Sequence, residues 1–248
     1  LFRDPFCSVS PDVASPHLVA VVLVSLPLFI IATVWYTAKE VYQPVPLTCC
    51  GPGCRSDGGA MAHYDEKYLD WQRGKGLRKA AAHDWTALLG VQKGDVVLDF
   101  GAGTGAILSS LTAAERRIAV EYSPAARRYM QTHDNTLETY QYPEEVPAES
   151  VVLVYSTSVI EHVECPVQEL RALLKALKPG GRIVLGVKNE GVELWQPWHP
   201  DNADKHLWTW NAKLLGNVLD SAGYVLVCVD AHGGARPGCT GEDPTPER

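Results

Sequence analysis

The sequence predicts an α/β fold with a doubly wound parallel sheet, preceded by a helix that spans a membrane. Short apolar runs alternate with helical patterns over residues 96–229, and this alternation is typical of a parallel sheet covered by helices on both faces. A glycine-rich turn, GAGTG, follows the first apolar run at residues 101–105. An uncharged run occupies residues 18–36. The 248 residues suffice for one catalytic domain with additional segments.

Residues 18–36 predict a transmembrane helix. The run LVAVVLVSLPLFIIATVWY has no charged side chain and matches the roughly 20 residues that cross a bilayer as a helix. Trp35 and Tyr36 end the run, where aromatic rings prefer the headgroup region. A cleaved signal peptide or a buried helix is the alternative. A retained helix implies a single-pass membrane protein, and the flanking basic residues slightly favour a cytoplasmic catalytic domain.

Composition divides the rest of the chain into four parts. Residues 1–17 form a flank before the span, and residues 37–60, rich in Pro, Gly and Cys, form a linker. Residues 61–230 form the catalytic domain, and residues 231–248, rich in Gly and Pro, form a disordered tail. The linker contains Cys49, Cys50 and Cys54. Palmitoylation, disulfide formation, metal binding and no modification at all are the alternatives for these cysteines.

The glycine-rich turn predicts a nucleoside-binding site. The apolar strand at residues 96–100 leads into three glycines and then a helix over residues 106–114. Glycine permits positive φ angles and lets a ligand approach backbone N–H groups closely. Glu121 ends the next apolar run, at the separation of about 20 residues where a carboxylate accepts hydrogen bonds from ribose hydroxyls.

The other elements follow from hydrophobic periodicity. Helices are expected at residues 61–90, 124–133, 166–177 and 211–222, and strands at residues 118–120, 137–142, 151–155, 182–187 and 224–229. The residues after the last of these strands are too rich in Gly and Pro to form another strand. The sheet is therefore expected to keep an open edge, which favours a homodimer.

Three further features, in this order and spacing, resemble class I S-adenosylmethionine-dependent methyltransferases, nearest to the methyltransferase type 11 group. They are Asp99 before the glycines, STSVIEHV at residues 156–163 and LKPGGRIVLGV at residues 177–187. The resemblance covers residues 64–230. It implies a Rossmann-like sheet whose usual seventh, antiparallel strand is apparently missing here. It also implies an enzyme that uses S-adenosyl-L-methionine to methylate a small-molecule, lipid or glycan acceptor.

The resemblance also implies which residues bind the cofactor. The Asp99 position holds the methionine end, the glycine loop passes beneath the cofactor, and the Glu121 position takes the ribose. The expected cofactor-binding residues are Asp99, Gly101, Ala102, Gly103, Gly105, Glu121, Tyr122 and Ser156. The third strand departs from the family pattern, so the adenine-site candidates are Glu138, Tyr140 and Gln141. Aromatic residues of the first helix are candidates to cover the substrate or the sulfonium: Tyr64, Tyr68 and Trp71.

Two histidines are the catalytic candidates. His162 follows the fourth strand at the carboxyl end of the sheet, where a neutral imidazole can take a proton from a hydroxyl or amine during methylation. His206 lies in residues 188–210, whose four tryptophans favour contact with a substrate. Each histidine is alternatively a structural residue that positions its loop. The spacing of His and Cys residues predicts no metal site.

Charge and the glycine motif leave two other functions open. The net charge of −7 and the lack of a basic run disfavour a nucleic-acid substrate. The sequence GAGTGA also fits a dinucleotide fingerprint, so an NAD(P)-dependent oxidoreductase is an alternative, although a Tyr-x-x-x-Lys pair is missing. A catalytically silent cofactor-binding protein is the other alternative, because the third strand is unusual and the seventh is not visible.

Overall fold

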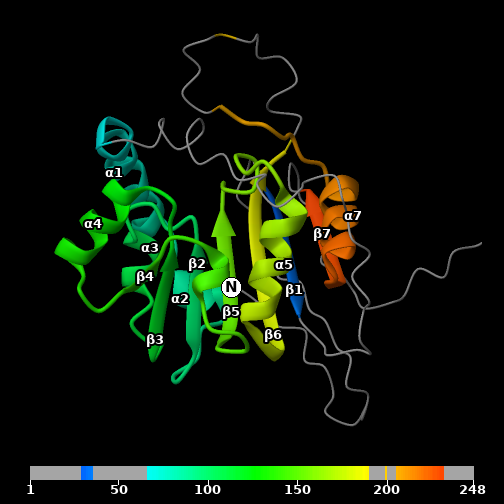
Figure 1. Cartoon of the computed structure of the whole chain (residues 1–248), viewed down its shortest axis with the longest axis horizontal. Helices are drawn as coiled ribbons and strands as arrows, with labels where there is room; N and C mark the ends of the chain where they lie inside the picture. Colours follow the sequence, from blue (N-terminus) through cyan, green and yellow to red (C-terminus); the bar gives the residue numbers. More distant parts are fainter. Residues whose placement is uncertain (1–28, 36–65, 190–198, 200–204, 232–248) are drawn as a thin grey trace, which may run out of the picture.

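The computed structural model describes residues 29–35, 66–189, 199 and 205–231. These residues form a seven-stranded sheet in the order β4-β3-β2-β5-β6-β1-β7 (Figure 1). The strands are β1 (Phe29–Trp35), β2 (Val96–Phe100), β3 (Arg116–Val120), β4 (Glu138–Tyr140), β5 (Val151–Thr157), β6 (Leu177–Lys188) and β7 (Val225–Ala231). The α-helices are α1 (Glu66–Ala81), α2 (Trp85–Leu89), α3 (Ala106–Ser110), α4 (Pro124–His133), α5 (Pro166–Ala176) and α7 (Ala212–Ala222). A short 3₁₀ helix, η2, covers Pro143–Glu145.

The parallel part of the sheet confirms the predicted doubly wound fold. Strands β4, β3, β2, β5 and β6 pair in parallel. All five residues of β2 are buried, and they alternate between two cores because successive side chains of a strand point to opposite faces. Leu98 packs in the core that contains α5 and α7. Val97 packs in the core that contains α2, α3 and α4.

Strand β1 corrects two predictions at once. It lies between β6 and β7 and runs antiparallel to both, so the N-terminal segment supplies the antiparallel strand that seemed to be missing after residue 230. The prediction of one transmembrane helix over residues 18–36 is wrong for Phe29–Trp35, which is a strand. A continuous apolar run fits a strand buried in a sheet as well as a helix buried in lipid.

The predictions of a membrane anchor, a linker and a tail fall largely on residues 1–28, 36–65 and 232–248, outside the described residues. Among the helices of the described part, none is both long and apolar enough to cross a bilayer. The single-pass location, with a cytoplasmic catalytic domain, stays a prediction. The homodimer also stays a prediction, although the open edge that motivated it is now the outer side of β7.

Other differences concern where elements end. The helix predicted to reach residue 114 stops at Ser110, and the helical region predicted over residues 61–90 is divided into α1 and α2 by Asp84, whose side chain accepts from Ala87 N–H. Helix α4 has the predicted bounds, and Ser123 is its N-cap, since Ser123 Oγ accepts from Ala126 N–H. The side chains of the aromatic candidates Tyr64, Tyr68 and Trp71 lie outside the described part.

Candidate active site

The glycine loop between β2 and α3 has the backbone that the sequence predicts. Gly101, Gly103 and Gly105 have φ angles of +78°, +56° and +71°. A Cβ on Gly101 would lie 2.3 Å from Val159 Cγ2, and one on Gly105 would lie 2.9 Å from Met130 Sδ. A Cβ on Gly103 would meet no atom of the described residues within 4 Å. The first and third glycines are therefore required by packing, whereas the space beside Gly103 is open to a ligand.

Glu121 follows the last residue of β3 and is tied to this loop. Its Oε2 accepts from Gly103 N–H at 2.8 Å, and its Oε1 accepts from Ser123 N–H at 2.8 Å. Burial raises the pKa of the Glu121 carboxyl, while these two N–H groups oppose the rise. Each carboxylate oxygen keeps a further lone pair, so the arrangement fits a ribose whose hydroxyls donate to Glu121 beside the open Gly103.

Asp99, in β2, is a buried carboxyl with one hydroxyl donor. The Tyr155 hydroxyl of β5 donates to Asp99 Oδ2 at 2.7 Å. Burial raises the pKa of Asp99 to about 7, against the hydrogen bond from Tyr155 and the charge of Lys79. Burial also lowers the pKa of Lys79, which lies in the last turn of α1. The sequence-based predictions missed Tyr155 and Lys79, since a tyrosine in an apolar strand and a lysine on an amphipathic helix are ordinary features.

The remaining predicted cofactor residues lie around the same loop. Ser156 is buried, and its hydroxyl donates to the Phe100 carbonyl at 2.8 Å, which ties β5 to β2. The Tyr122 ring lies against the rings of Phe100 and Tyr142, with centroids 6.1 and 5.5 Å apart. Ala102 is half-buried in the turn. The structure thus brings all eight predicted residues together, and their contacts with the cofactor stay predictions.

Two of the adenine-site candidates are engaged by arginines. Glu138 accepts from Arg116 Nε and Nη2, each at 2.8 Å. Gln141 Oε1 accepts from Arg127 Nη2 at 3.2 Å. Arg127, in α4, also donates to the carbonyls of Glu121 and Tyr122. Arg127 therefore fixes the chain direction just after the ribose-site carboxylate.

The second part of the site joins the two predicted catalytic histidines. The rings of His162 and His206 meet edge to face, with centroids 4.7 Å apart. Leu207 N–H and Trp208 N–H both donate to the Glu161 carbonyl, at 2.8 and 3.2 Å. The Trp208 indole N–H donates to the Val163 carbonyl at 2.7 Å. These three bonds fix the segment at residues 205–210 against the turn at residues 158–163.

Trp208 and Trp210 are two of the four tryptophans that favoured a substrate-facing loop, and they have different environments. Trp210 is buried in the core, with 1% of its surface exposed, and Trp208 remains 41% exposed. The prediction of a substrate-facing loop therefore fails for Trp210, which packs with α5 and α7. Residues 190–198 and 200–204 lie outside the described part.

Glu161 is a further site residue that the sequence-based predictions missed. Its side chain is completely buried, and neither carboxylate oxygen has a hydrogen-bond partner among the described residues. Burial raises the pKa of Glu161 to about 7, against nearby N–H groups and the charges of Lys188 and Lys79. Ligand atoms of Glu161, His162 and His206 all lie within 4.8 Å of one another. The signal that the sequence offered was a glutamate between apolar residues in the segment VIEHV.

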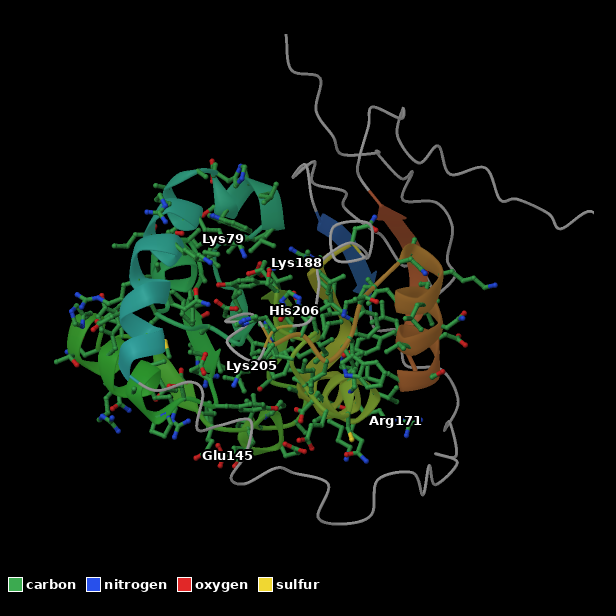
Figure 2. All side chains as sticks on the ribbon, turned by 90° about the horizontal axis from the view of Figure 1, so that it is seen from above. Lys79, Glu145, Arg171, Lys188, Lys205 and His206 are labelled. Atoms are coloured by element: carbon green, nitrogen blue, oxygen red, sulfur yellow. The ribbon has the colours of Figure 1, made fainter. Side chains whose placement is uncertain are left out.

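Figure 2 looks from above onto the carboxyl ends of the parallel strands, toward which the β5 arrow points in Figure 1. Lys79, Lys188 and His206 are labelled near one another in the middle of this view. They come from α1, from the end of β6 and from residues 205–210. The carboxyl ends of strands are where open α/β sheets bind their ligands.

Comparison with known proteins identifies the family. A family described as a methyltransferase domain matches residues 73–229. The chain belongs to this methyltransferase family. With its sheet order and glycine loop, it has the class I methyltransferase fold, whose cofactor is S-adenosylmethionine. A solved S-adenosylmethionine-dependent methyltransferase from Thermotoga maritima has the same fold, with a TM-score of 0.55 and 16% identity, over 66% of this chain and 81% of its own length.

Two curated relatives have names that give two different acceptors. A malonyl-[acyl-carrier protein] O-methyltransferase of Marinomonas sp. (strain MWYL1) is 29% identical over 60% of this methyltransferase and 56% of its own length. A tRNA U34 carboxymethyltransferase of Desulfotalea psychrophila is 27% identical over 54% of this methyltransferase and 47% of its own length. The chain thus spans about half the length of the curated relatives that it matches.

Proposed function

We propose that this methyltransferase transfers the methyl group of S-adenosylmethionine to a hydroxyl oxygen of a small-molecule, lipid or glycan acceptor. The observation that carries this proposal is the meeting of His162 and His206, beside the buried Glu161, at the same end of the sheet as the glycine loop. A hydroxyl must lose its proton as its oxygen is methylated, so groups that take up or promote the loss of a proton belong near the acceptor.

The cofactor side of the proposal rests on the glycine loop and its two carboxyls. S-adenosylmethionine supplies an electrophilic methyl group when bound, so the protein mainly has to align the acceptor and exclude water. Gly103 and Glu121 would hold the nucleoside, and Asp99 would face the cationic methionine end. The positions of these residues support a working cofactor site.

The oxygen acceptor is supported by one relative, the Marinomonas enzyme, which is an O-methyltransferase by name. The net charge of −7 supports an acceptor other than nucleic acid, although the Desulfotalea relative acts on tRNA. The family match removes the oxidoreductase alternative. The hypothesis of a catalytically silent protein loses one of the two observations that supported it, the missing seventh strand, because β1 completes the seven-stranded sheet.

The test is release of S-adenosylhomocysteine by the full chain, measured with small polyols, phenols, glycans, hydroxylated lipids and tRNA as separate acceptors. We expect turnover with one of the non-nucleic-acid hydroxyl classes and at least a tenfold lower kcat in His162→Ala and in His206→Ala. Cofactor binding should be retained in both variants. Turnover with tRNA alone would contradict the acceptor class, and undiminished kcat in both variants would contradict the placement of the acceptor.

A further inference from the structure

The cluster of Glu161, His162 and His206 has the composition of a metal site. Two imidazoles and one carboxylate are the protein ligands of several catalytic zinc centres and of non-haem iron centres. The donor atoms lie within 4.8 Å of one another. Bonds of about 2.0–2.2 Å to a common ion place tetrahedral ligands roughly 3.3–3.6 Å apart, so the side chains need to close by only about 1 Å.

A second, independent observation comes from the Glu161 carboxylate. This side chain is fully buried, and within the part of the chain that the structure describes neither of its oxygens has a hydrogen-bond partner. A buried carboxylate without such partners costs several kcal/mol on the general scale, so these groups are normally paired or coordinate a cation. The backbone carbonyl of Glu161 accepts from Leu207 and Trp208. The same residue therefore holds the His206 segment in place and leaves its side chain available to an ion.

The positions of the two histidines are fixed by the backbone before any ion binds. His162 N–H donates to the Val159 carbonyl at 2.9 Å, which closes the turn that carries Glu161. The Trp208 indole bond to the Val163 carbonyl anchors the opposite segment. Ligands held in this way lose little conformational entropy on binding, and three protein ligands leave at least one coordination position open.

Two positive charges act against a cation here. Lys188 and Lys79 both lower the pKa of Glu161 through their charges, and each would repel a metal ion. Burial in turn lowers the pKa of Lys79, which makes its positive charge easier to lose. A metal that binds imidazole nitrogen strongly is therefore favoured over Mg²⁺ or Ca²⁺, which prefer oxygen ligands.

We propose that Glu161, His162 and His206 bind one divalent transition-metal cation, which coordinates the acceptor hydroxyl oxygen in its open position. This inference deepens the proposed function and rests on it for the identity of the acceptor. A coordinated hydroxyl loses its proton to water more readily than a free one. An electron pair of the oxygen then forms the new O–C bond, while the pair of the breaking C–S bond stays on sulfur and gives S-adenosylhomocysteine. Coordination thereby takes over the task assigned above to a histidine base.

The test is titration of the chelator-treated full chain with Co²⁺, followed by calorimetry and visible absorption. We expect one equivalent of Co²⁺ bound with a spectrum of nitrogen and oxygen ligands, and at least a tenfold loss of affinity in Glu161→Gln, His162→Ala and His206→Ala. His133→Ala, which removes an exposed histidine on α4, is the matched control and should bind as the unmodified chain does. A variant with Cys49, Cys50 and Cys54 changed to serine should also keep the site.

Cofactor binding by each variant is measured in the same calorimeter. If it is retained, the variant is folded, and its loss of metal affinity is not due to unfolding. No binding of Co²⁺ by the folded chain would overturn the proposal. So would a thiolate spectrum that disappears in the cysteine variant while the three ligand variants still bind. Because the titration needs neither acceptor nor turnover, its failure is distinguishable from failure of the proposed methyl transfer. Loss of activity on metal removal, with cofactor affinity retained, would additionally place the ion at the acceptor.

Discussion

The cofactor half of the sheet, residues 96–142, and the acceptor half, residues 151–231 together with β1, are each built around a buried carboxyl. Burial raises the pKa of Asp99 and of Glu161 to about 7 in both halves. Asp99 accepts from a tyrosine hydroxyl, whereas the oxygens of Glu161 have no hydrogen-bond partner in the residues that the structure describes. Similar burial with unequal hydrogen bonding fits the two proposed roles, in which Asp99 belongs to a preformed cofactor site and Glu161 has a side chain that a ligand would complete.

The two halves also differ in how far apart in the sequence the segments that form them lie. The glycine loop, Glu121 and α4 lie within one continuous stretch of chain, and the bond from Gly103 N–H to Glu121 is made within it. The acceptor half is assembled from distant segments. Its β1 comes from the N-terminal side, and His206 reaches His162 through a segment after residue 204. Substitutions in the acceptor half should therefore affect residues that lie farther away in the sequence.

The largest effect is expected where the acceptor half depends on β1. In Ala32→Pro, proline loses the backbone N–H and disturbs a strand that is paired on both sides, with Leu185 and Val229 as partners of Ala32. We expect a loss of about 3 kcal/mol or more of unfolding free energy, the scale of a proline inside regular structure. Denaturant unfolding measures it.

Ala32→Val is the matched control, because a β-branched residue suits a strand and also suits a membrane helix. A proline variant that is as stable as this control would mean that residues 29–35 are not a central strand. A chain that begins at residue 37 should be destabilised at least as strongly as Ala32→Pro. Cofactor measurements on this protein therefore need residues 29–35.

The outcome of sequence prediction follows the same division. The cofactor half could be predicted almost completely, since strand 96–100, the three glycines and the 124–133 helix are set by local backbone chemistry: positive φ angles at glycine and an N-cap at Ser123. In the acceptor half, β5, α5 and half of β6 were predicted, but β1 was mistaken for a membrane helix. An apolar run shows that a segment is buried, but not in which environment.

The acceptor site could be predicted only as separate residues. His162 and His206 were both candidates, but nothing local shows that their rings lie 4.7 Å apart. Glu161 was missed because a glutamate beside a histidine is common on solvated turns. Its burial arises from the Leu207 and Trp208 bonds to its carbonyl and from packing of neighbours such as Ile160, which is 1% exposed. Tertiary packing, which the sequence pattern does not display, decides these features.

The glycine loop allows a sharper separation of packing from binding. Gly101→Ala places a Cβ 2.3 Å from Val159 Cγ2 at a φ of +78°, so we expect a stability loss of roughly 2–4 kcal/mol. Gly103→Ala has a positive φ but meets nothing within 4 Å, so its loss should be about 1 kcal/mol. Thermal unfolding without ligand measures both.

For cofactor affinity we expect the opposite order of the two variants, with the larger loss in Gly103→Ala. In Gly103→Ala the new methyl group occupies the space proposed for the nucleoside, and we expect at least a tenfold weaker Kd for S-adenosylhomocysteine in calorimetry. Unchanged affinity in a folded Gly103→Ala protein would mean that the cofactor does not pass beside this residue. Equal stability of the two variants would argue against the close contact between Gly101 and Val159 that joins the two halves.

Asp99 should give a pH-dependent effect on stability. Its pKa is raised from the ordinary value near 4 to about 7 in the folded protein, so the unfolded chain releases this proton at lower pH. The stability contribution of protonated Asp99 is present below pH ~4 and is lost as pH rises through about 7. Asp99→Asn removes this loss, so the Tm of the variant minus that of the unmodified chain should be higher at pH 8 than at pH 5.

Tyr155→Phe is the companion variant. It removes the hydroxyl that donates to Asp99 Oδ2 and stabilises the ionised carboxyl, so its decrease in Tm should be greater at pH 8 than at pH 5. A Tm difference for Asp99→Asn that is the same at both pH values would contradict a raised pKa at this position. Weaker cofactor binding by Asp99→Asn, despite its higher stability at pH 8, would separate binding from folding within the cofactor half.

The smallest effect is expected at the outer edge of the cofactor half, where Arg116 holds Glu138 through two bonds of 2.8 Å. The two side chains are 41% and 37% exposed, so solvent screening reduces the pair to about 0.2–1 kcal/mol. Glu138→Gln and Arg116→Gln should each lower stability by this small amount. Because Glu138 is already engaged by Arg116, Glu138→Gln should leave the Kd for S-adenosylhomocysteine within about twofold, the scale of a few tenths of a kcal/mol. A tenfold loss in Glu138→Gln but not in Arg116→Gln would instead make Glu138 a ligand of the adenine ring, as the sequence position suggested, and would move the boundary of the cofactor site outward to β4.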